Sequence, residues 1–293
     1  MAQSINADLN NNVIAQQALE QFTKILAPLN AFSTSFNDEA GNRGDKITIL
    51  NLANTSSVSD FSGSYSSSGD TFGRSQITLD NHKVVAWHLT DTERSQSSSL
   101  ELTRFAYQKG GELATAVIED IFSAINSTDY GTALTKTGTF GIDEVANARK
   151  LAVDANLPID DTSLVLSPTS FSTLIQDSVV GSALNYGSSD AVREGKVPSL
   201  MGIPNVIETN ATLDASSVDG FLAHPSGLAV AMRYLEPLDS KEYISAKKIS
   251  DPKTGLVMGY REFYDPTAGK LTAILECVYG YAVGRPEAII RLK

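Results

Sequence analysis

The sequence has 293 residues, with 23 Lys and Arg against 34 Asp and Glu, a formal net charge of −11 and an isoelectric point of about 4.7. Proteins that read DNA or bind anionic membrane surfaces neutralise phosphates with basic side chains, so this acidic balance argues against both functions. The length suffices for a substantial core in one or two domains.

Residues 1–44 are polar, with one short amphipathic stretch inside them. Its apolar residues recur at helical spacing until Pro28 ends the run, which predicts a short helix. These residues are Val13, Ala18, Leu19, Phe22, Ile25 and Leu26. Because so short a helix is unstable alone in water, we expect it to dock either on its own domain or on a neighbouring chain.

Two alternating stretches, 46–52 and 76–89, predict strands on either side of a Ser/Gly-rich segment at 54–70. That segment is almost free of aliphatic residues and cannot bury enough apolar area to fold by itself. We therefore expect a long two-stranded excursion with a Ser/Gly tip. A two-stranded ribbon is marginal alone in water, so it is expected to lie across a neighbouring subunit.

A long helix is predicted over 93–126, with capping residues supplied by 90–93. Its apolar residues follow a spacing of three and four: Leu102, Phe105, Ala106, Leu113, Val117, Ile121 and Ala124. Such a helix would reach roughly 45–50 Å at 1.5 Å per residue. Gly110 and Gly111 lie midway and predict a bend, because each glycine weakens a helix by about 1 kcal/mol relative to Ala.

Residues 140–240 alternate between helical and strand patterns, which predicts an α/β domain. Helices are expected at 142–156, 169–176 and 225–233, strands at 163–167, 203–208 and 220–224, and a Gly/Ser-rich loop at 179–199.

Three antiparallel strands are predicted in the last third of the chain, at 243–250, 256–264 and 270–283. Two Asp-Pro-x-x-Gly turns separate them, at 251–255 and 265–269. This pattern is typical of chain reversals, because Pro presets φ and Gly permits the turn. The segment is therefore expected to form a β-meander.

The sequence contains none of the usual catalytic or phosphate-binding motifs. His82 and His88 share a strand face but lack a third ligand, so a structural or surface role is expected. His224 precedes Pro225 and is expected to cap or pack at a helix start. We expect no catalytic residue, no cofactor and no metal, and hence no enzyme.

The single cysteine, Cys277, excludes an intrachain disulfide and lies in the apolar run 273–279, where it is expected to pack as a small hydrophobe. The carboxylates of Asp160 and Asp161, and those of Glu144 and Asp154, are expected to face solvent.

Four of the predicted parts would expose much surface in a monomer: the N-terminal arm, the thin β-excursion, the overlong helix and the Gly/Ser-rich loop. A repeating assembly can bury all four against neighbouring copies. In this order the parts resemble the HK97-fold major capsid proteins of tailed bacteriophages, among them the P22-coat-like and related phage capsid families. The segments that carry the resemblance are Gly-Asp-Lys-Ile-Thr-Ile at 44–49, Leu-Thr-Asp at 89–91, Leu-Val-Leu-Ser-Pro at 164–168, Gly-Ile-Pro-Asn-Val-Ile-Glu at 202–208, His-Pro-Ser-Gly-Leu-Ala at 224–229, Tyr-Arg-Glu-Phe-Tyr-Asp-Pro at 260–266 and Glu-Cys-Val-Tyr-Gly at 276–280. No single motif is diagnostic, and their order is what is specific.

The resemblance implies an α+β, HK97-like capsid fold with an N-terminal arm, an extended β-loop, a long spine helix, a peripheral domain and an α/β axial domain. The implied division is an arm at 1–43, an extended loop at 44–90, the spine helix and peripheral domain at 91–139, the axial domain at 140–240, and a β-meander that returns to the peripheral domain at 241–293.

The function implied by the resemblance is self-assembly as hexamers and pentamers into an icosahedral shell around double-stranded DNA. The chain would be made in the cytoplasm of a host bacterium and reside in the virion capsid. Its partners would be further copies of itself and portal, scaffolding and decoration proteins, with no sequence-specific DNA binding and no membrane contact. An acidic wall suits a shell that holds DNA without adhering to it.

Alternatives remain open: an encapsulin-like compartment shell, a gene-transfer-agent capsid, or a soluble α/β enzyme with an accessory arm. The sequence offers no basis for a covalent Lys–Asn cross-link between chains. Gly110 and Gly111 are expected to act as a hinge during maturation. The residues expected at assembly contacts are Phe22, Phe61, Tyr65, Phe72, Gly110, Gly111 and Tyr186.

Overall fold

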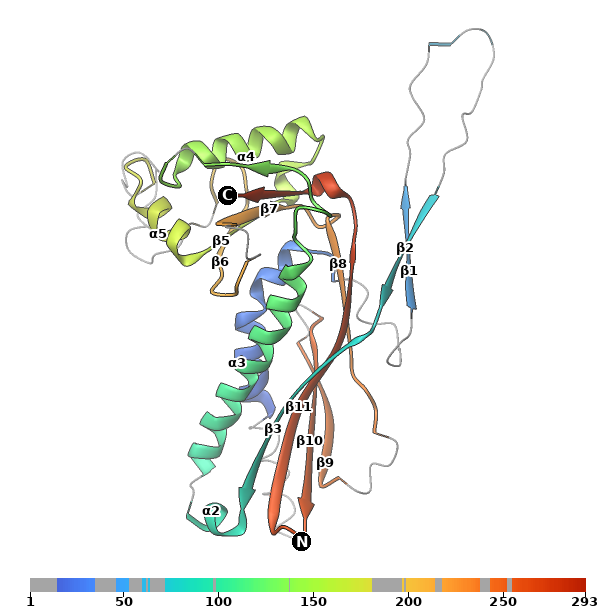
Figure 1. Ribbon diagram of the computed structural model, residues 1–293, viewed down its shortest axis with the longest axis vertical. Helices are drawn as coiled ribbons and strands as arrows, with labels where there is room; N and C mark the ends of the chain where they lie inside the picture. The colour runs from blue at the N-terminus through green and yellow to red at the C-terminus, as the bar shows by residue number, and fades with distance from the viewer. Residues whose placement is uncertain are drawn as a thin grey trace.

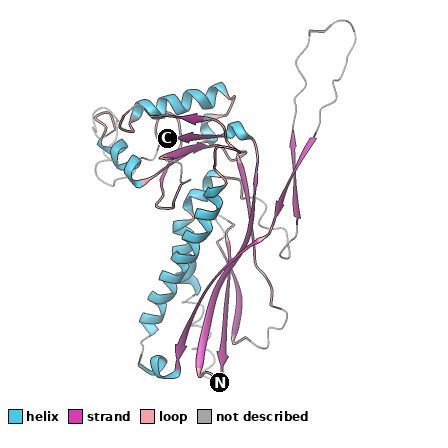
Figure 2. Cartoon of the chain, in the orientation of Figure 1, coloured by secondary structure: helices cyan, strands magenta, loops and turns pink. Residues whose placement is uncertain are grey.

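The computed structural model describes residues 15–34, 46–52, 60–61, 63, 72–96, 99–136, 138–180, 197, 199–213, 218–237, 243–251 and 255–293. The molecule is elongated, with a long helix beside a sheet in its body and a smaller α/β unit at one end (Figure 1). A two-stranded ribbon projects beside that end. The strands of the body are much longer than those of the α/β unit (Figure 2).

The body is built on a five-stranded antiparallel sheet. Along one path the order is β3 (Asn81–Thr90), β11 (Lys270–Val283), β10 (Val257–Asp265) and β9 (Ser245–Ser250), and β8 (Leu228–Arg233) pairs with the second half of β11. The strands β9, β10 and β11 follow one another as neighbours, which confirms the predicted β-meander.

The α/β unit holds a second five-stranded sheet. Its order is β4 (Ala133–Leu134), β12 (Ile289–Leu292), β7 (Gly220–Ala223), β5 (Ser163–Leu166) and β6 (Asn205–Glu208). The helices α4 (Ile142–Asp154) and α5 (Pro168–Gln176) belong to the same unit, and a short 3-10 turn, η2 (Ile159–Asp161), lies between them. A further 3-10 turn, η4 (Pro286–Ala288), precedes β12.

Each of the two predicted segments contributes one strand to the sheet of the other. The strand β8 lies within the predicted axial segment but pairs with β11 of the body. The strand β12 lies within the predicted meander segment but pairs with β7 of the α/β unit. At this junction the buried hydroxyl of Tyr130 donates to the carbonyl of Gly227 at 2.6 Å, and Nε of Arg291 donates to the carbonyl of Tyr130 at 2.8 Å.

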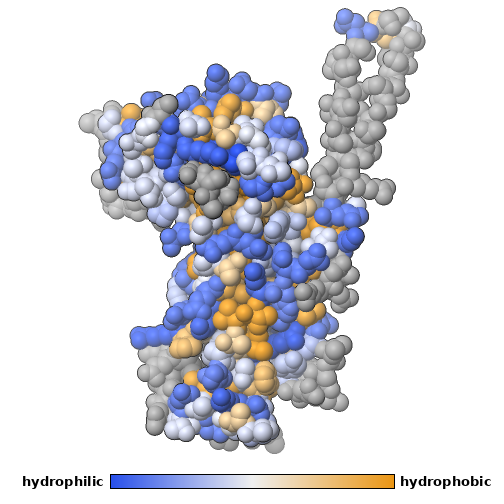
Figure 3. Space-filling view, in the orientation of Figure 1, coloured by the Kyte–Doolittle hydropathy of each residue, from blue (hydrophilic) through white to orange (hydrophobic). Residues whose placement is uncertain are grey.

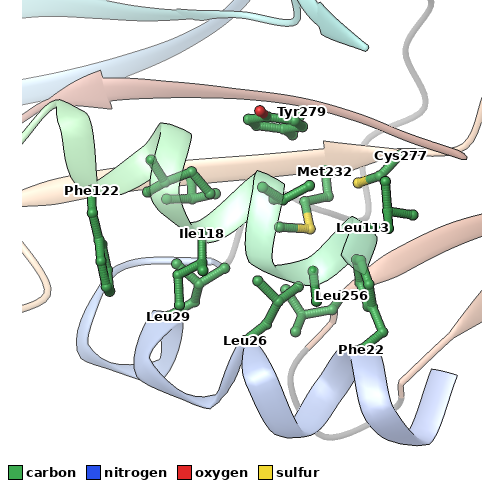
Figure 4. Packing of buried hydrophobic residues seen from close by; sticks show 14 of the residues in the cluster. Phe22, Leu26, Leu29, Leu113, Ile118, Phe122, Met232, Leu256, Cys277 and Tyr279 are labelled. Carbon is green, nitrogen blue, oxygen red and sulfur yellow. The ribbon is translucent and has the colours of Figure 1, made fainter. Parts of the chain in front are cut away.

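The predicted N-terminal helix is present over residues 15–25 and docks on its own chain. Together with the 3-10 turn η1 (Ala27–Ala31) it packs against the helix α3 (Ser99–Ser123), which in turn covers the sheet (Figure 4). Phe22, Leu26 and Leu29 face Leu113 and Ile118 of α3 in this core. Of the two docking sites expected from the sequence, the chain's own domain is therefore the one occupied.

The predicted long helix is found as two helices, α2 (Asp91–Gln96) and α3. The predicted cap of α2 is present, since Glu93 accepts from the backbone N–H of Thr90 at 2.9 Å and the hydroxyl of Thr90 accepts from the N–H of Glu93 at 3.3 Å. At 1.5 Å per residue α3 is about 37 Å long, shorter than expected.

Gly110 and Gly111 lie inside α3, which continues through both as one helix. The N-terminal helix crosses α3 at this point. A Cβ at Gly110 would overlap the carbonyl oxygen of Ala18 and lie 3.0 Å from its carbonyl carbon. The close crossing of two helices therefore gives Gly110 a packing role. A hinge at this position stays a prediction.

The helix predicted at 225–233 is wrong, because residues Leu228–Arg233 form the strand β8. Leu, Ala and Met favour helices by only a few tenths of a kcal/mol per residue, and pairing with β11 outweighs that preference. The side chains alternate between two clusters. Leu228, Val230 and Met232 enter the main core, and Ala229 and Ala231 enter a smaller cluster on the opposite face.

The prediction that Glu144 faces solvent is also wrong. Glu144 is buried at the start of α4, where its carboxylate accepts from the backbone N–H of Gly141 at 2.9 Å. A carboxylate in the first turn satisfies an otherwise unpaired N–H group and complements the helix dipole. Asp160 and Asp161 are exposed, as expected.

We expect Gly110→Ala to destabilise the fold by about 1–3 kcal/mol, because the added methyl overlaps a backbone atom of a packed helix. Gly111→Ala is the matched control, since the atoms nearest to its Cβ would belong to side chains, those of Gln21 at 3.2 Å and Ile25 at 3.4 Å. That variant should be neutral or gain up to about 1 kcal/mol of helix propensity. Guanidinium unfolding measures both, and equal stability of the two variants would contradict the packing role.

Candidate assembly arm and its attachment

The ribbon predicted from the sequence is formed by β1 (Lys46–Leu52) and β2 (Phe72–Thr78), here called the arm. Most of the predicted second stretch, 76–89, is not part of the ribbon, because residues 81–90 form β3 of the body sheet. The two strands pair antiparallel from Lys46 opposite Thr78 to Leu52 opposite Phe72. The arm projects away from the sheet of the body (Figure 1). Such a ribbon exposes the unpaired edges of both strands, which favours pairing with another chain.

The arm is attached to the body by a small apolar cluster at its base. Ile47 and Ile77 are buried there, together with Leu79, which follows β2. Their partners on the body are Ala229 and Ala231 of β8 and Val278 of β11.

An ionic cluster around the buried Glu276 lies beside this attachment. Glu276 of β11 pairs with Arg261 of β10 at 2.6 Å and with Nε2 of His82 at 3.2 Å, and His82 is the second residue of β3. The Arg261 guanidinium also donates to the carbonyl of Leu235 at 2.6 Å and lies over the ring of Tyr243. The cluster thus joins three strands and the segment that follows β8.

Sequence reasoning did not identify this ionic cluster as a site. The available signal was Glu276, a charged residue inside the apolar run 273–279. A charge in such a run is buried when the strand is central, and it then requires partners. Arg261 lies on the preceding strand of the meander, whereas His82 comes from a strand distant in sequence, so the sequence pattern could not name that second partner.

The residues expected at assembly contacts fall into three groups. Phe22, Gly110 and Gly111 come together at the helix crossing and are buried within the chain. Phe61 lies 67 % exposed between the two strands of the arm in sequence. Tyr65, Tyr186 and the side chain of Phe72 lie outside the described residues, although the backbone of Phe72 begins β2.

Other large apolar side chains are exposed on the body and on the α/β unit. Figure 3 shows apolar atoms gathered on the lower part of the body, with further ones over the α/β unit. The exposed side chains are Val84, Phe105, Ile244 and Tyr264 on the body, and Val153, Val179 and Met201 on the α/β unit.

The remaining candidate residues have structural surroundings. His88 is exposed on β3. His224 lies in the turn between β7 and β8, not at a helix start, and its Nδ1 is 2.8 Å from the hydroxyl of Ser226. Partial burial lowers the pKa of His224. Within the described ranges no three His, Cys, Asp or Glu side chains gather as metal ligands, and none of the helices there is long and apolar enough to cross a membrane.

Cys277 is buried in the main core, as expected, and burial raises the pKa of its thiol to about 12. We expect the native protein to resist Ellman's reagent even at about pH 9, where an ordinary thiol is largely ionised. Unfolding in guanidinium should make the thiol react fully. Rapid reaction of the native protein at that pH would contradict the burial.

We expect Arg261→Met to destabilise the fold by about 3–5 kcal/mol, because it leaves the Glu276 carboxylate buried without its closest cation. Adding Glu276→Leu should restore part of that loss, since the second change removes the unpaired charge. Guanidinium unfolding of the two variants checks the order. An Arg261→Met protein within about 0.5 kcal/mol of wild type would show that the pair contributes nothing.

Similarity to known proteins is found in the three-dimensional structure. No family model and no curated protein matches the sequence. A structure from Mycobacterium phage Che8 aligns over 85 % of this chain and 85 % of that chain, with a TM-score of 0.60 and 21 % identity. The capsid structure of the cyanophage P-SCSP1u aligns over 89 % of this chain and 85 % of that chain, with a TM-score of 0.56 and 15 % identity.

A third similar structure is a virus-like particle from Pyrococcus furiosus. It covers 96 % of this chain and 98 % of that chain, with a TM-score of 0.54 and 11 % identity. At sequence identities this low, the likeness shows the fold alone. That fold agrees with the resemblance found in the sequence. This chain has the HK97-like fold of phage capsid structures.

Proposed function

We propose that this chain is the major capsid protein of a tailed bacteriophage, which assembles as hexamers and pentamers into an icosahedral shell around double-stranded DNA. The observation that carries the proposal is the arm, which is attached through Ile47 and Ile77 at its base and projects from a body with the capsid fold. A ribbon of this kind gains stability by lying on another subunit.

The rest of the site also favours a structural role over catalysis. Beside the arm, the buried Glu276 pairs with Arg261 and with His82, both of which are partly exposed. Pairing of this kind holds neighbouring strands of a scaffold together. The similar structures include a phage capsid and a virus-like particle.

The division into an N-terminal arm, extended loop, spine helix, peripheral domain and axial domain belongs to this proposal. So do the partners, which would be copies of this chain and portal, scaffolding and decoration proteins. Exposed Met201 and Val153 of the α/β unit are available to contacts around the local symmetry axes.

A second candidate is the shell of a protein compartment or gene-transfer particle. The virus-like particle from Pyrococcus furiosus favours it, because that chain and this one match over nearly their whole lengths. The contents of purified particles distinguish the candidates. Nuclease-protected double-stranded DNA supports a virus or gene-transfer particle, and a packaged enzyme supports a compartment.

The purified chain should form closed particles visible by negative-stain electron microscopy. Replacing residues 53–71 with Asn-Gly keeps the register of Leu52 opposite Phe72, because Asn-Gly favours the two-residue hairpin turn. We expect this variant to fold, with an unchanged circular dichroism spectrum, and to lose closed particles, since the tip that would reach a neighbour is gone.

A pair of point variants controls for the deletion. Phe61→Ser removes the exposed ring and should reduce the yield of particles, whereas Phe61→Tyr keeps the ring and should leave it near wild type. A monomeric wild-type protein under all assembly conditions would refute the proposed function. Normal particles from the 53–71 replacement would refute the role of the arm.

A further inference from the structure

The base of the arm packs on a patch of small side chains on β8 and β11, here called the seat. On β8 and β11 the directly paired residues Ala231 and Gly280, and Ala229 and Ala282, lie side by side. The neighbouring Val278 and the two alanines of β8 contact Ile47 and Ile77 of the arm. Small residues let the arm approach the backbone of the sheet closely.

Gly280 is where the approach is closest. A Cβ at this position would overlap the carbonyl oxygen of Thr78, the last residue of β2, and lie 2.8 Å from its carbonyl carbon. It would also lie 3.1 Å from Cγ2 of Ile77. Two of these neighbours are backbone atoms, which cannot rotate away, so any side chain at position 280 must displace the end of β2.

A second contact with β11 follows shortly after the point where Thr78 lies on Gly280. Only three residues separate Thr78 from His82, and His82 pairs with Glu276 on β11. In the sheet register His82 stands opposite Val278, next to the seat. The junction between β2 and β3 is therefore fixed at two points along the same strand.

We infer that Gly280 is a positioning residue for the arm: with the seat and the His82–Glu276 pair, it sets the direction in which the arm leaves the body. The direction is encoded within the single chain and is present before any neighbour binds. This inference rests on the proposed function for its consequence, since the direction of the arm decides which part of a second copy its tip reaches. A displaced arm would give misassembled or unclosed particles.

The direction of the arm can be measured in one chain. Spin labels attached at Thr48→Cys on β1 and Ser123→Cys at the end of α3, both exposed, report the distance between arm and body. A second pair, Ser123→Cys and Lys248→Cys on β9, reports the body alone. Labelled chain is diluted into an excess of unlabelled chain, so that only distances within one chain are recorded.

Gly280→Ala should shift or broaden the distribution of arm-to-body distances and leave the distances within the body unchanged. Gly131→Ala is the matched control, because a Cβ there meets nothing within 4 Å, and it should change neither distribution. An arm-to-body distribution identical to wild type in a folded Gly280→Ala protein would overturn the inference.

If Gly280→Ala does not fold, Ile77→Ala tests the seat from the arm side without adding an atom. It removes the side chain that β2 buries against the seat, and the arm-to-body distribution should broaden. An unchanged distribution in that variant would overturn the inference as well.

The two proposals can fail separately. A chain that forms no particles refutes the proposed function, and its distance measurements still decide whether Gly280 directs the arm. Particles of normal size and yield from a Gly280→Ala chain with a displaced arm would refute the consequence for assembly.

Discussion

The rest of the structure depends on the long strand β11, which has different partners on its two faces. Successive side chains of a strand point to opposite sides. Leu275, Cys277 and Tyr279 enter the core beneath α3, whereas Glu276 and Val278 hold the ionic cluster and the base of the arm. A shift of one residue in register would place Glu276 in the apolar core, so the pattern of this strand fixes helix, sheet and arm together.

The elements with a clear local pattern could be predicted from the sequence. The strand β1, the start of α4 and the helix opened by Pro168 are found where the pattern indicates, because hydrophobic period and capping residues are local signals. The residues of β8 predict a helix and form a strand, since they favour helices locally and the strand that pairs with them, β11, lies far along the sequence. Glu144 was misplaced because the capped N–H of Gly141 is visible only in three dimensions.

The existence of the arm could be predicted from the sequence, but the contacts that attach it to the body could not. Alternation at 46–52 and the Ser/Gly-rich stretch at 54–70 indicate a ribbon that needs a partner. The role of Gly280 depends on a crossing between residues 78 and 280, and that of Gly110 on a crossing with residue 18. A glycine at a close approach carries no local signal, so sequence reasoning assigned Gly110 to a bend.

The position of β12 bears on when the molecule can complete its fold during synthesis. This strand is formed by Ile289–Leu292, yet it lies inside the α/β sheet, between β4 and β7, and all four of its residues are buried. The sheet therefore lacks an interior strand until residues 289–292 have emerged from the ribosome. A nascent chain keeps β7 as an open edge until then, and β12 seals that edge against pairing with other unfinished chains.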